Sequence, residues 1–399
     1  MGKPMRVVYI ADIGIAGGAT KSLVELVDTM RTRFHVEPIV FTSGNNELNK
    51  QLNDKKIENY SLGYGAFLQG APDALWKKPV KWVLLGWVYY INFYLALKKA
   101  MNTIDWNEVD LIHTNVARDD IGMEISKRTG VPNICHIREF AEIDFNCWSY
   151  RPKYVEYLDK NVDGFISISK AVKNYWVEKG LTERKVDVIY NGVDEDRIST
   201  ADHTTWEKDD ILRLVIVGGV IPNKGQWQAI KAICALPDRI RKTIRLDVIG
   251  GITETYKNKL SAPLRKAGIA SQVQFLGACS DVYDRLKNYH IGLMCSKAEG
   301  FGRVTVEYMH AGLAVIASDC GANPELIQNN VTGILYDRNR TESLTQAILG
   351  LVKDRKKMVE IARRGQAQAK ERYTKELNAA NIYKIYQKYV PCVESECEE

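Results

Sequence analysis

Met5-Arg-Val-Val-Tyr-Ile-Ala-Asp12 is a short, mostly β-branched and apolar run without helical spacing. It leads into a glycine-rich stretch, Gly14-Ile-Ala-Gly17-Gly18-Ala19, and then into residues 22–30, whose apolar side chains recur at helical spacing. A strand, a glycine turn and a helix in this order form the first unit of a doubly wound α/β fold. The start of the chain therefore predicts a Rossmann-like domain.

Similar strand patterns recur along the chain, several of them separated by helical patterns. Alternating strands and helices predict parallel sheets that are covered on both faces. The further strands are expected at 36–41, 110–114, 133–137, 164–168, 185–190, 212–217, 245–249, 273–276, 291–294, 313–318 and 333–335.

This pattern stops once and restarts, which predicts two domains. Residues 199–211 are polar, lack a periodic apolar face and are interpreted as a linker. The linker separates an N-terminal domain (1–198) from a C-terminal domain (212–371). A last helix at 372–390 is expected to return to the first domain, before an acidic tail at 391–399. Because ligands bind beyond the carboxyl ends of parallel strands, we expect the site in a cleft between the domains.

The composition is that of a globular protein with a mild positive charge. Hydrophobic residues make up 45% and charged residues 26% of the 399, with a net charge of +6. This charge suits anionic ligands or an anionic membrane surface, but the chain lacks the basic and aromatic clusters of a nucleic-acid-binding protein. The eight cysteines form no CxxC pair. We expect reduced thiols in a cytoplasmic protein without a secretory signal.

The strongest motif is Glu299-Gly-Phe-Gly-Arg-Val-Thr-Val-Glu307, which follows a predicted strand and opens a predicted helix near Arg303. The amides of residues 300–303 would point out of the helix N-terminus, where peptide N–H groups and the helix dipole bind phosphate. The alternative is that Glu299 and Glu307 are a capping and a surface acid. The glycine–aromatic–glycine turn between them favours a ligand site.

This motif resembles the Glu-x7-Glu signature of the retaining glycosyltransferases of family four, as found in bacterial capsular and exopolysaccharide glycosyltransferases. The resemblance runs from Arg6 to about Tyr389 and implies the GT-B fold, two Rossmann-like domains with parallel sheets. It also implies that Glu299 contacts hydroxyls of the transferred sugar and that Glu307 contacts the ribose. The amides of Gly300, Phe301 and Gly302 would then lie near the sugar and the pyrophosphate.

Two glycine-containing loops are expected to approach the diphosphate. The first holds Gly17 and Gly18, for which a plain tight turn is the alternative. The second is Val217-Gly-Gly-Val-Ile-Pro-Asn-Lys224-Gly225, in which Lys224 occupies the family's Lys-Gly position. There the family usually has an arginine where this chain has Gly219, so one cation is missing. We expect Arg303 to supply part of that charge, because a cation in the first helical turn requires a nearby anion.

Asn133-Ile-Cys-His136-Ile-Arg-Glu-Phe140 is expected to end a strand close to the reacting groups. By resemblance His136 contacts the donor sugar, and a core histidine is the alternative. Arg138 and Glu139 could line the acceptor side. The family's Asn-Gly-Val-Asp turn corresponds to Asn191 and its neighbours, with a hinge as the first interpretation and ligand contact as the second.

The segment Trp76–Lys99 combines several Trp and Tyr residues with lysines at both ends. Its uncharged part, 82–97, is too short and interrupted for a membrane span. Two interpretations stay open: a helix at a membrane interface, and a buried helix of the first domain.

These observations together predict a retaining hexosyltransferase. It would use a nucleotide diphosphate sugar, by resemblance a UDP-sugar, and a saccharide acceptor, by resemblance lipid-linked, in cell-surface polysaccharide or glycoconjugate biosynthesis. Asp194-Glu-Asp196 lies at the domain boundary rather than in a metal-binding loop, so no divalent metal or cofactor is expected and fixed cations do the electrostatic work. A membrane-borne acceptor would place the enzyme at the inner face of the plasma membrane. The alternatives are a catalytically silent nucleotide-sugar-binding partner subunit, a GT-B-like phosphorylase and an epimerase.

Overall fold

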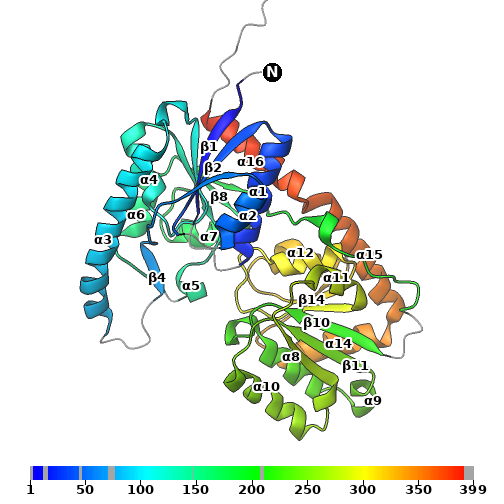
Figure 1. Ribbon diagram of the computed structural model, residues 1–399. Helices are drawn as coiled ribbons and strands as arrows, with labels where there is room; N and C mark the ends of the chain where they lie inside the picture. Colours follow the sequence, from blue (N-terminus) through cyan, green and yellow to red (C-terminus); the bar gives the residue numbers. More distant parts are fainter. Residues whose placement is uncertain are drawn as a thin grey trace, which may run out of the picture. The chain divides into compact units, whose positions relative to one another are not determined.

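The computed structural model describes residues 3–11, 17–44, 47–70, 77–145, 147–206 and 211–390. Within the helices and strands, the side chains of 77–84, 145 and 147 are not described. The chain divides into two compact units (Figure 1). Unit 1 contains the residues up to Gly192 and those from Lys375 onward, and unit 2 contains Val193–Thr374. Part of the first glycine loop, Trp76 and the acidic tail lie outside the described residues.

Unit 1 is built on a parallel sheet with the strand order β3-β2-β1-β5-β6-β8-β9. The interior strand β1 pairs Val8 with Ile39 on one side and with Ile112 on the other. These apolar residues are completely buried, as expected for a parallel sheet covered on both faces. The strands are β1 Met5–Ala11, β2 Val36–Thr42, β3 Glu58–Ser61, β5 Leu111–Thr114, β6 Asn133–Ile137, β8 Gly164–Ser167 and β9 Val186–Val188.

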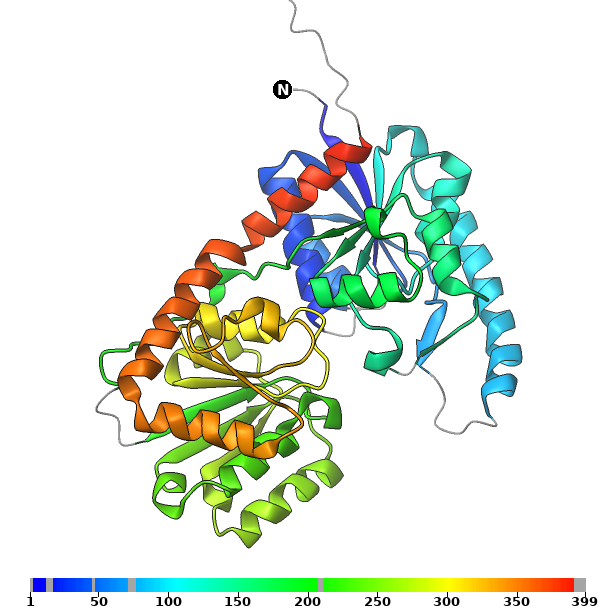
Figure 2. The ribbon, with the colours of Figure 1, turned by 180° about the vertical axis from the view of Figure 1, so that it is seen from behind.

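The helices of unit 1 include the last helix of the chain. α16 (Lys375–Tyr389) packs against α1 (Figure 2). Its Ile382 and Tyr386 lie in the same core as Tyr9 and Leu111. The other elements are α1 Gly18–Arg33, α2 Glu47–Asp54, α3 Lys77–Thr103, α4 Ile121–Thr129, α5 Glu142–Phe145, α6 Tyr154–Asn161, α7 Lys170–Glu178 and a small antiparallel pair, β4 Leu68–Gly70 and β7 Cys147–Ser149.

Unit 2 repeats the doubly wound pattern with the parallel strand order β12-β11-β10-β13-β14-β15. Its strands are β10 Leu212–Val217, β11 Ile244–Ile249, β12 Val273–Gly277, β13 Ile291–Met294, β14 Ala314–Ser318 and β15 Ile334–Tyr336. Its helices are α8 Gln226–Cys234, α9 Asp238–Arg241, α10 Glu254–Lys266, α11 Val282–Arg285, α12 Arg303–His310, α13 Asn323–Leu326, α14 Thr341–Lys353 and α15 Arg355–Arg372. The prediction of two Rossmann-like halves with parallel sheets is confirmed.

The strand order of unit 2 also gives the place of a ligand site. The connections run in opposite directions from β10, so the topological switch point lies between β10 and β13. Ligands of open α/β sheets bind beyond the carboxyl ends of the strands at this point. The loops that follow β10 and β13 contain Lys224 and Glu299, respectively.

The described part of the expected linker is packed onto unit 2. Ala201 N–H donates to the carbonyl of Ala311, and the ring of Trp206 is buried against His203 and His290. The buried ring of Trp206 helps to hold this polar segment on unit 2. A single buried tryptophan gives no periodic apolar pattern, so the sequence pattern did not predict this packing. The units therefore divide at Gly192, rather than at the predicted linker.

Candidate functional site

The loop between β13 and α12 carries Glu299 and is held rigidly. A Cβ at Gly321 would lie 2.4 Å from the Glu299 carbonyl oxygen, so only glycine lets these backbones approach. The Ala322 N–H donates to the same oxygen at 2.9 Å. Phe301 is buried with its ring edge-on to Tyr373. These contacts fix the main chain and leave the Glu299 side chain 16% exposed.

The loop ends at Gly302, which is the N-cap of α12 and has a φ of +86°. Glycine adopts this conformation readily but has no side-chain oxygen to accept from the first amides of the helix. No described side chain caps this turn, and the turn contains no acidic residue. The start of α12 therefore has backbone donors and a helix dipole suited to an anion.

Lys224 lies against this loop because of the glycine that follows it. Gly225 has a φ of +74°, and a Cβ at this position would lie 2.0 Å from the Cys295 carbonyl oxygen. The amide of Lys297 donates to the carbonyl of Asn223 and joins the two loops. In this arrangement the Lys224 ammonium lies 3.0 Å from Glu299 Oε2. The structure thus brings two of the predicted catalytic residues into direct contact.

Gly219, where the resembling family has arginine, faces open space. A Cβ added there would meet no atom within 4 Å, whereas the preceding Gly218 has a φ of +138°. The Gly219 carbonyl accepts from the Gln226 side chain at 3.1 Å. The loop therefore has room for a side chain at position 219.

Arg303 and Glu307 form an ion pair across one turn of α12. Their Nε and Oε1 atoms are 3.0 Å apart, and the side chains are only 10% and 7% exposed. The Tyr283 hydroxyl donates to the same Oε1 at 2.9 Å, and Arg303 Nη2 donates to this hydroxyl at 3.3 Å. A cation in the first turn of a helix requires a nearby anion, and from the sequence we expected the diphosphate to be the anion beside Arg303. In the structure Glu307 is that anion, because the i,i+4 spacing places the two side chains together.

In unit 1, Gly17 and Gly18 form the exposed start of α1. Gly17 is the N-cap with an extended backbone, and no described side chain caps this turn. The residues before them, 12–16, lie outside the described part of the chain. The two glycines are therefore placed at a helix N-terminus that follows β1, next to the switch point between β1 and β5.

Arg138 follows β6 and hydrogen-bonds two other predicted site residues of unit 1, Asn191 and His136. It is 8% exposed, and its Nε donates to the backbone and side-chain oxygens of Asn115. Its Nη1 donates to Asn191 Oδ1 at 3.0 Å, and its Nη2 to His136 Nδ1 at 3.1 Å. Glu139 is half-buried, and its carbonyl accepts from the Trp176 indole. The structure therefore brings Arg138, Asn191 and His136 together.

His136 is completely buried at the end of β6. Burial, followed by the charge of Arg138, lowers its pKa well below the usual value, so the ring is neutral. Because Nδ1 accepts from Arg138, the proton lies on Nε2, and this atom has no hydrogen-bond partner among the described residues. The burial favours a core histidine, while an unpaired N–H is the feature that points to a ligand.

His113 on β5 extends this network to the last helix. Its Nε2 lies 3.3 Å from His136 Nδ1, and its Nδ1 lies 2.7 Å from the Tyr386 hydroxyl. Burial and the charge of Arg138 lower the pKa of His113 to about 3. The sequence analysis did not single out His113, Asn115 or Tyr283. For His113 and Asn115, their position at the end of a predicted strand was the available signal.

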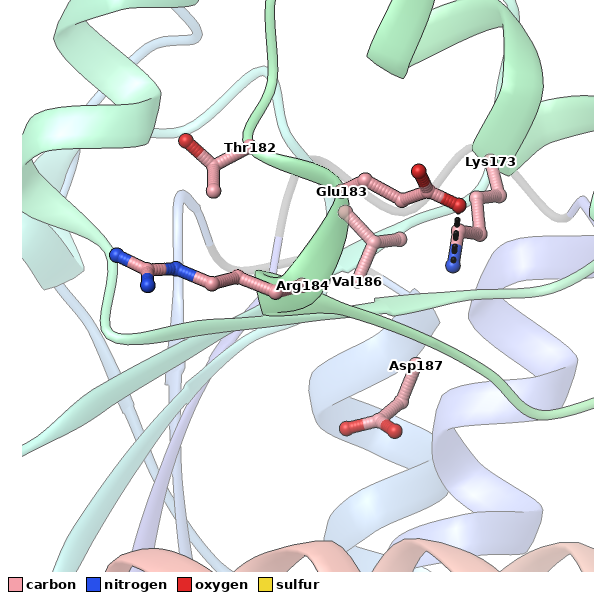
Figure 3. Close-up of a pocket in the computed structure, with 6 residues that line it drawn as sticks. All are labelled: Lys173, Thr182, Glu183, Arg184, Val186 and Asp187. Atoms are coloured by element: carbon pink, nitrogen blue, oxygen red, sulfur yellow. Dashed lines mark ion pairs between the residues drawn. The ribbon is translucent and has the colours of Figure 1, made fainter.

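Two depressions on the described surface are lined by none of these residues. One, of about 620 Å³, lies beside β9 and is lined by Lys173, Thr182, Glu183, Arg184, Val186 and Asp187 (Figure 3). Lys173 and Glu183 pair across it at 3.6 Å. It is wide open and contains none of the predicted site residues, so it is not the candidate site.

Two family models match the chain and together cover most of it. The model described as "Glycosyltransferase Family 4" matches residues 16–197, and the model described as "Glycosyl transferases group 1" matches residues 200–368. The two matches meet close to the boundary between the structural units.

The curated relatives are glycosyltransferases. An uncharacterized glycosyltransferase of Methanocaldococcus jannaschii is 25% identical over 75% of this chain and 80% of its own. A GDP-mannose-dependent α-(1-6)-phosphatidylinositol monomannoside mannosyltransferase of Mycobacterium tuberculosis is 28% identical over 44% of this chain and 49% of its own. The chain thus spans about half the length of the second relative.

Solved structures with the same fold cover 96% of this chain. Anabaena HepE, solved in complex with UDP and glucose, has a TM-score of 0.76 and 20% identity over 96% of this chain and 100% of its own. WaaG, a glycosyltransferase involved in lipopolysaccharide biosynthesis, has a TM-score of 0.63 and 15% identity over 96% and 100%. At these identities the likeness shows the fold alone.

Proposed function

Since the chain belongs to the family-four type of glycosyltransferases, which have the GT-B fold, we propose that it transfers a hexose from a nucleotide diphosphate sugar to a hydroxyl of a saccharide acceptor. The observation that carries this proposal is the 3.0 Å contact between Lys224 and Glu299 beside the uncapped start of α12. An ammonium, a carboxylate and the backbone amides of a helix N-terminus at one switch point suit a phosphorylated sugar.

In this proposal the loops of unit 2 hold the donor. The amides of residues 300–303 and the ammonium of Lys224 bind the diphosphate. Glu299 accepts from hydroxyls of the sugar, and Glu307, oriented by Arg303 and Tyr283, accepts from the ribose. Lys224 is paired with Glu299 in the structure, so donor binding shares this ammonium between the carboxylate and the diphosphate. Charge-assisted hydrogen bonds of this kind contribute about 1.5–3 kcal/mol each.

The proposed transfer retains the configuration at the anomeric carbon. The bond from that carbon to the diphosphate oxygen breaks, and the acceptor oxygen forms its bond on the same face. A leaving-group oxygen takes the acceptor proton. Lys224 and the backbone donors stabilise the negative charge that develops on the diphosphate, so the reaction needs no divalent metal.

The donor base is proposed to be uridine. HepE, which shares the fold, was solved with UDP and glucose, whereas the mycobacterial relative uses GDP-mannose. A guanosine donor is therefore the direct competitor in an experiment.

The acceptor is proposed to be a lipid-linked saccharide in cell-surface glycoconjugate synthesis, used by an enzyme at the inner face of the plasma membrane. Relatives named for lipopolysaccharide core and phosphatidylinositol mannoside synthesis support this class. In unit 1, Arg138 and Asn191 would bind the acceptor, and the buried His136 Nε2–H would donate to the sugar.

A thermal-shift screen with UDP-hexoses and GDP-mannose, with and without EDTA, tests the donor assignment. A ligand at about 100 times its Kd adds about 2.7 kcal/mol of stability. We expect a shift with a UDP-hexose that EDTA leaves unchanged and that Lys224→Met removes. Product analysis by NMR then checks retention. Release of sugar phosphate, formation of an epimer, or no turnover with any acceptor would instead support a phosphorylase, an epimerase or a silent subunit.

A further inference from the structure

α3 (Lys77–Thr103) presents two different faces, and one of them is tied firmly to unit 1. Tyr89 donates to the buried carboxylate of Asp120 and stacks on Tyr150 at 5.0 Å. Phe93 lies under the guanidinium of Arg151 at 5.4 Å. These contacts, together with the buried Ala96, Leu97 and Ala100, fix the rotation of the helix about its own axis. This face of α3 therefore agrees with the interpretation of a buried helix of the first domain, whereas the other face does not.

The opposite face of α3 is apolar and exposed. We call it the outer face of α3; its large side chains are 51–70% exposed, and they are Trp87, Val88, Ile91, Tyr94 and Leu95. Leu85 and Tyr90 are 42% and 43% exposed at its edges, and the Tyr90 hydroxyl donates to the Tyr150 carbonyl. Trp87, Ile91, Tyr94 and Leu95 follow the i, i+4, i+7, i+8 spacing of one helical stripe. Seven of the ten large hydrophobic side chains exposed among the described residues lie on this one helix. Such a concentration marks an interaction surface.

The charges of α3 have a single sign. No Asp or Glu occurs from Lys77 to Thr103, and five lysines flank the apolar part: Lys77, Lys78 and Lys81 before it, and Lys98 and Lys99 after it. Lys98 is exposed and continues the stripe of Trp87 by helical spacing, while Lys99 donates to the carbonyl of Ser61. Lysines outside a stripe rich in Trp and Tyr are typical of helices in a lipid interface, where each cation near an anionic surface adds to binding.

We propose that the outer face of α3 docks on an anionic lipid surface. The helix lies flat in the headgroup region, with Trp87, Ile91 and Leu95 inserted and the exposed Lys98 at the phosphate level. Among the described residues no helix is long and apolar enough to cross a membrane. A lipid surface matches both the apolar stripe and the uniform positive charge. This inference does not depend on the transfer reaction, because the binding is measured without donor or acceptor.

Vesicle sedimentation of the full chain tests the proposal. Wild-type protein is expected to sediment with vesicles of equal parts phosphatidylglycerol and phosphatidylcholine, and to remain in solution with phosphatidylcholine alone. The double variant Ile91→Ser/Leu95→Ser should lower the partition coefficient about tenfold or more, because two inserted aliphatic side chains are lost. Lys98→Glu, which changes only an exposed charge, should weaken binding to the anionic vesicles.

The matched control is Ile143→Ser/Leu377→Ser, which removes two exposed aliphatic side chains outside α3 and should bind like wild type. Thermal unfolding and nucleotide-sugar binding of each variant show that its units are folded. The proposal is overturned if wild type stays in the supernatant with anionic vesicles, or if the control loses binding equally. It is also overturned if size-exclusion chromatography shows a dimer that the α3 double variant dissociates while vesicles bind neither protein, since a second copy then covers this face.

Discussion

Replacing Gly219 by arginine is expected to tighten the binding of a nucleoside diphosphate. The residue lies in the loop after β10 that also carries Lys224. Its φ lies outside the left-handed region and its Cβ direction is open, so a side chain meets neither strain nor a neighbour. The resembling family uses an arginine at this position. The substitution therefore adds a cation beside the proposed diphosphate site without repacking the unit.

The size of the gain follows from two opposing contributions. A charge-assisted hydrogen bond to a phosphate contributes about 1.5–3 kcal/mol, and ordering an exposed arginine side chain costs up to about 1.5–2 kcal/mol. The mid-range values leave a gain of about 0.5 kcal/mol and the most favourable values about 1.5 kcal/mol, which corresponds to a Kd lowered about two- to tenfold.

Isothermal titration with UDP measures this change for wild type, Gly219→Arg and Gly219→Gln, the last being a long polar side chain without the charge. The gain of the arginine variant should shrink at high salt, because exposed charges are screened. Gly218→Arg is the control for backbone strain, because Gly218 has a φ of +138°, which residues with a side chain rarely adopt. Equal affinities for the arginine and glutamine variants would refute the idea that a diphosphate lies beside this loop.

The other predictions concern the ion pairs and the buried histidine. Lys224→Met should weaken UDP binding about 10- to 100-fold by titration calorimetry, because one charge-assisted contact is lost. Glu299→Gln, in contrast, should leave UDP affinity unchanged and abolish transfer. Equal losses of affinity in the two variants would contradict these separate roles. Arg303→Met should lower the free energy of unfolding, measured in urea, by about 3 kcal/mol, because it leaves Glu307 buried without its cation. Adding Glu307→Gln to this variant should restore most of that loss. Additive losses would show that the ion pair is not formed. His113 has a pKa of about 3 in the folded chain and about 6.5 in the unfolded chain. Between these pH values the unfolded state binds more protons than the folded state. The free energy of unfolding therefore falls as the pH drops below about 6.5. The slope is up to about 1.4 kcal/mol per pH unit, and His113→Gln should flatten the dependence of Tm on pH; an unchanged slope would place the titration elsewhere.

The strands of the two parallel sheets, apart from β3, were predictable from the sequence because local rules decide them; the polar run of β3 was not predicted. Runs such as Leu212–Val217 are mostly apolar and β-branched, are buried except for Arg213 and Val217, and are followed by glycines, so composition alone sets their bounds to within a residue or two. The start of α12 was predictable for the same reason, since the glycines at 300 and 302 and the apolar run after them indicate a turn followed by a helix.

The remaining features depend on partners distant in the sequence or on the choice between two partners. Trp206 fixes the polar segment before β10 by packing on His290, a contact across more than eighty residues that no local pattern contains. Arg303 had two possible anions, and only the geometry shows that it contacts Glu307. The burial of His136 follows from the covering of β6 by elements far along the chain, which its strand position alone does not reveal.

The contribution of α16 to the core of unit 1 has a consequence for biosynthesis. Ile382 and Tyr386 complete an interior whose first strand, β1, leaves the ribosome hundreds of residues earlier. Unit 2 is complete once Thr374 has been synthesised, so the unit that is begun second can fold first. Until the last helix emerges, nascent unit 1 has an unfilled apolar surface that chaperones can bind. Producing this unit alone would require Lys375 and the residues after it to be joined directly behind Gly192.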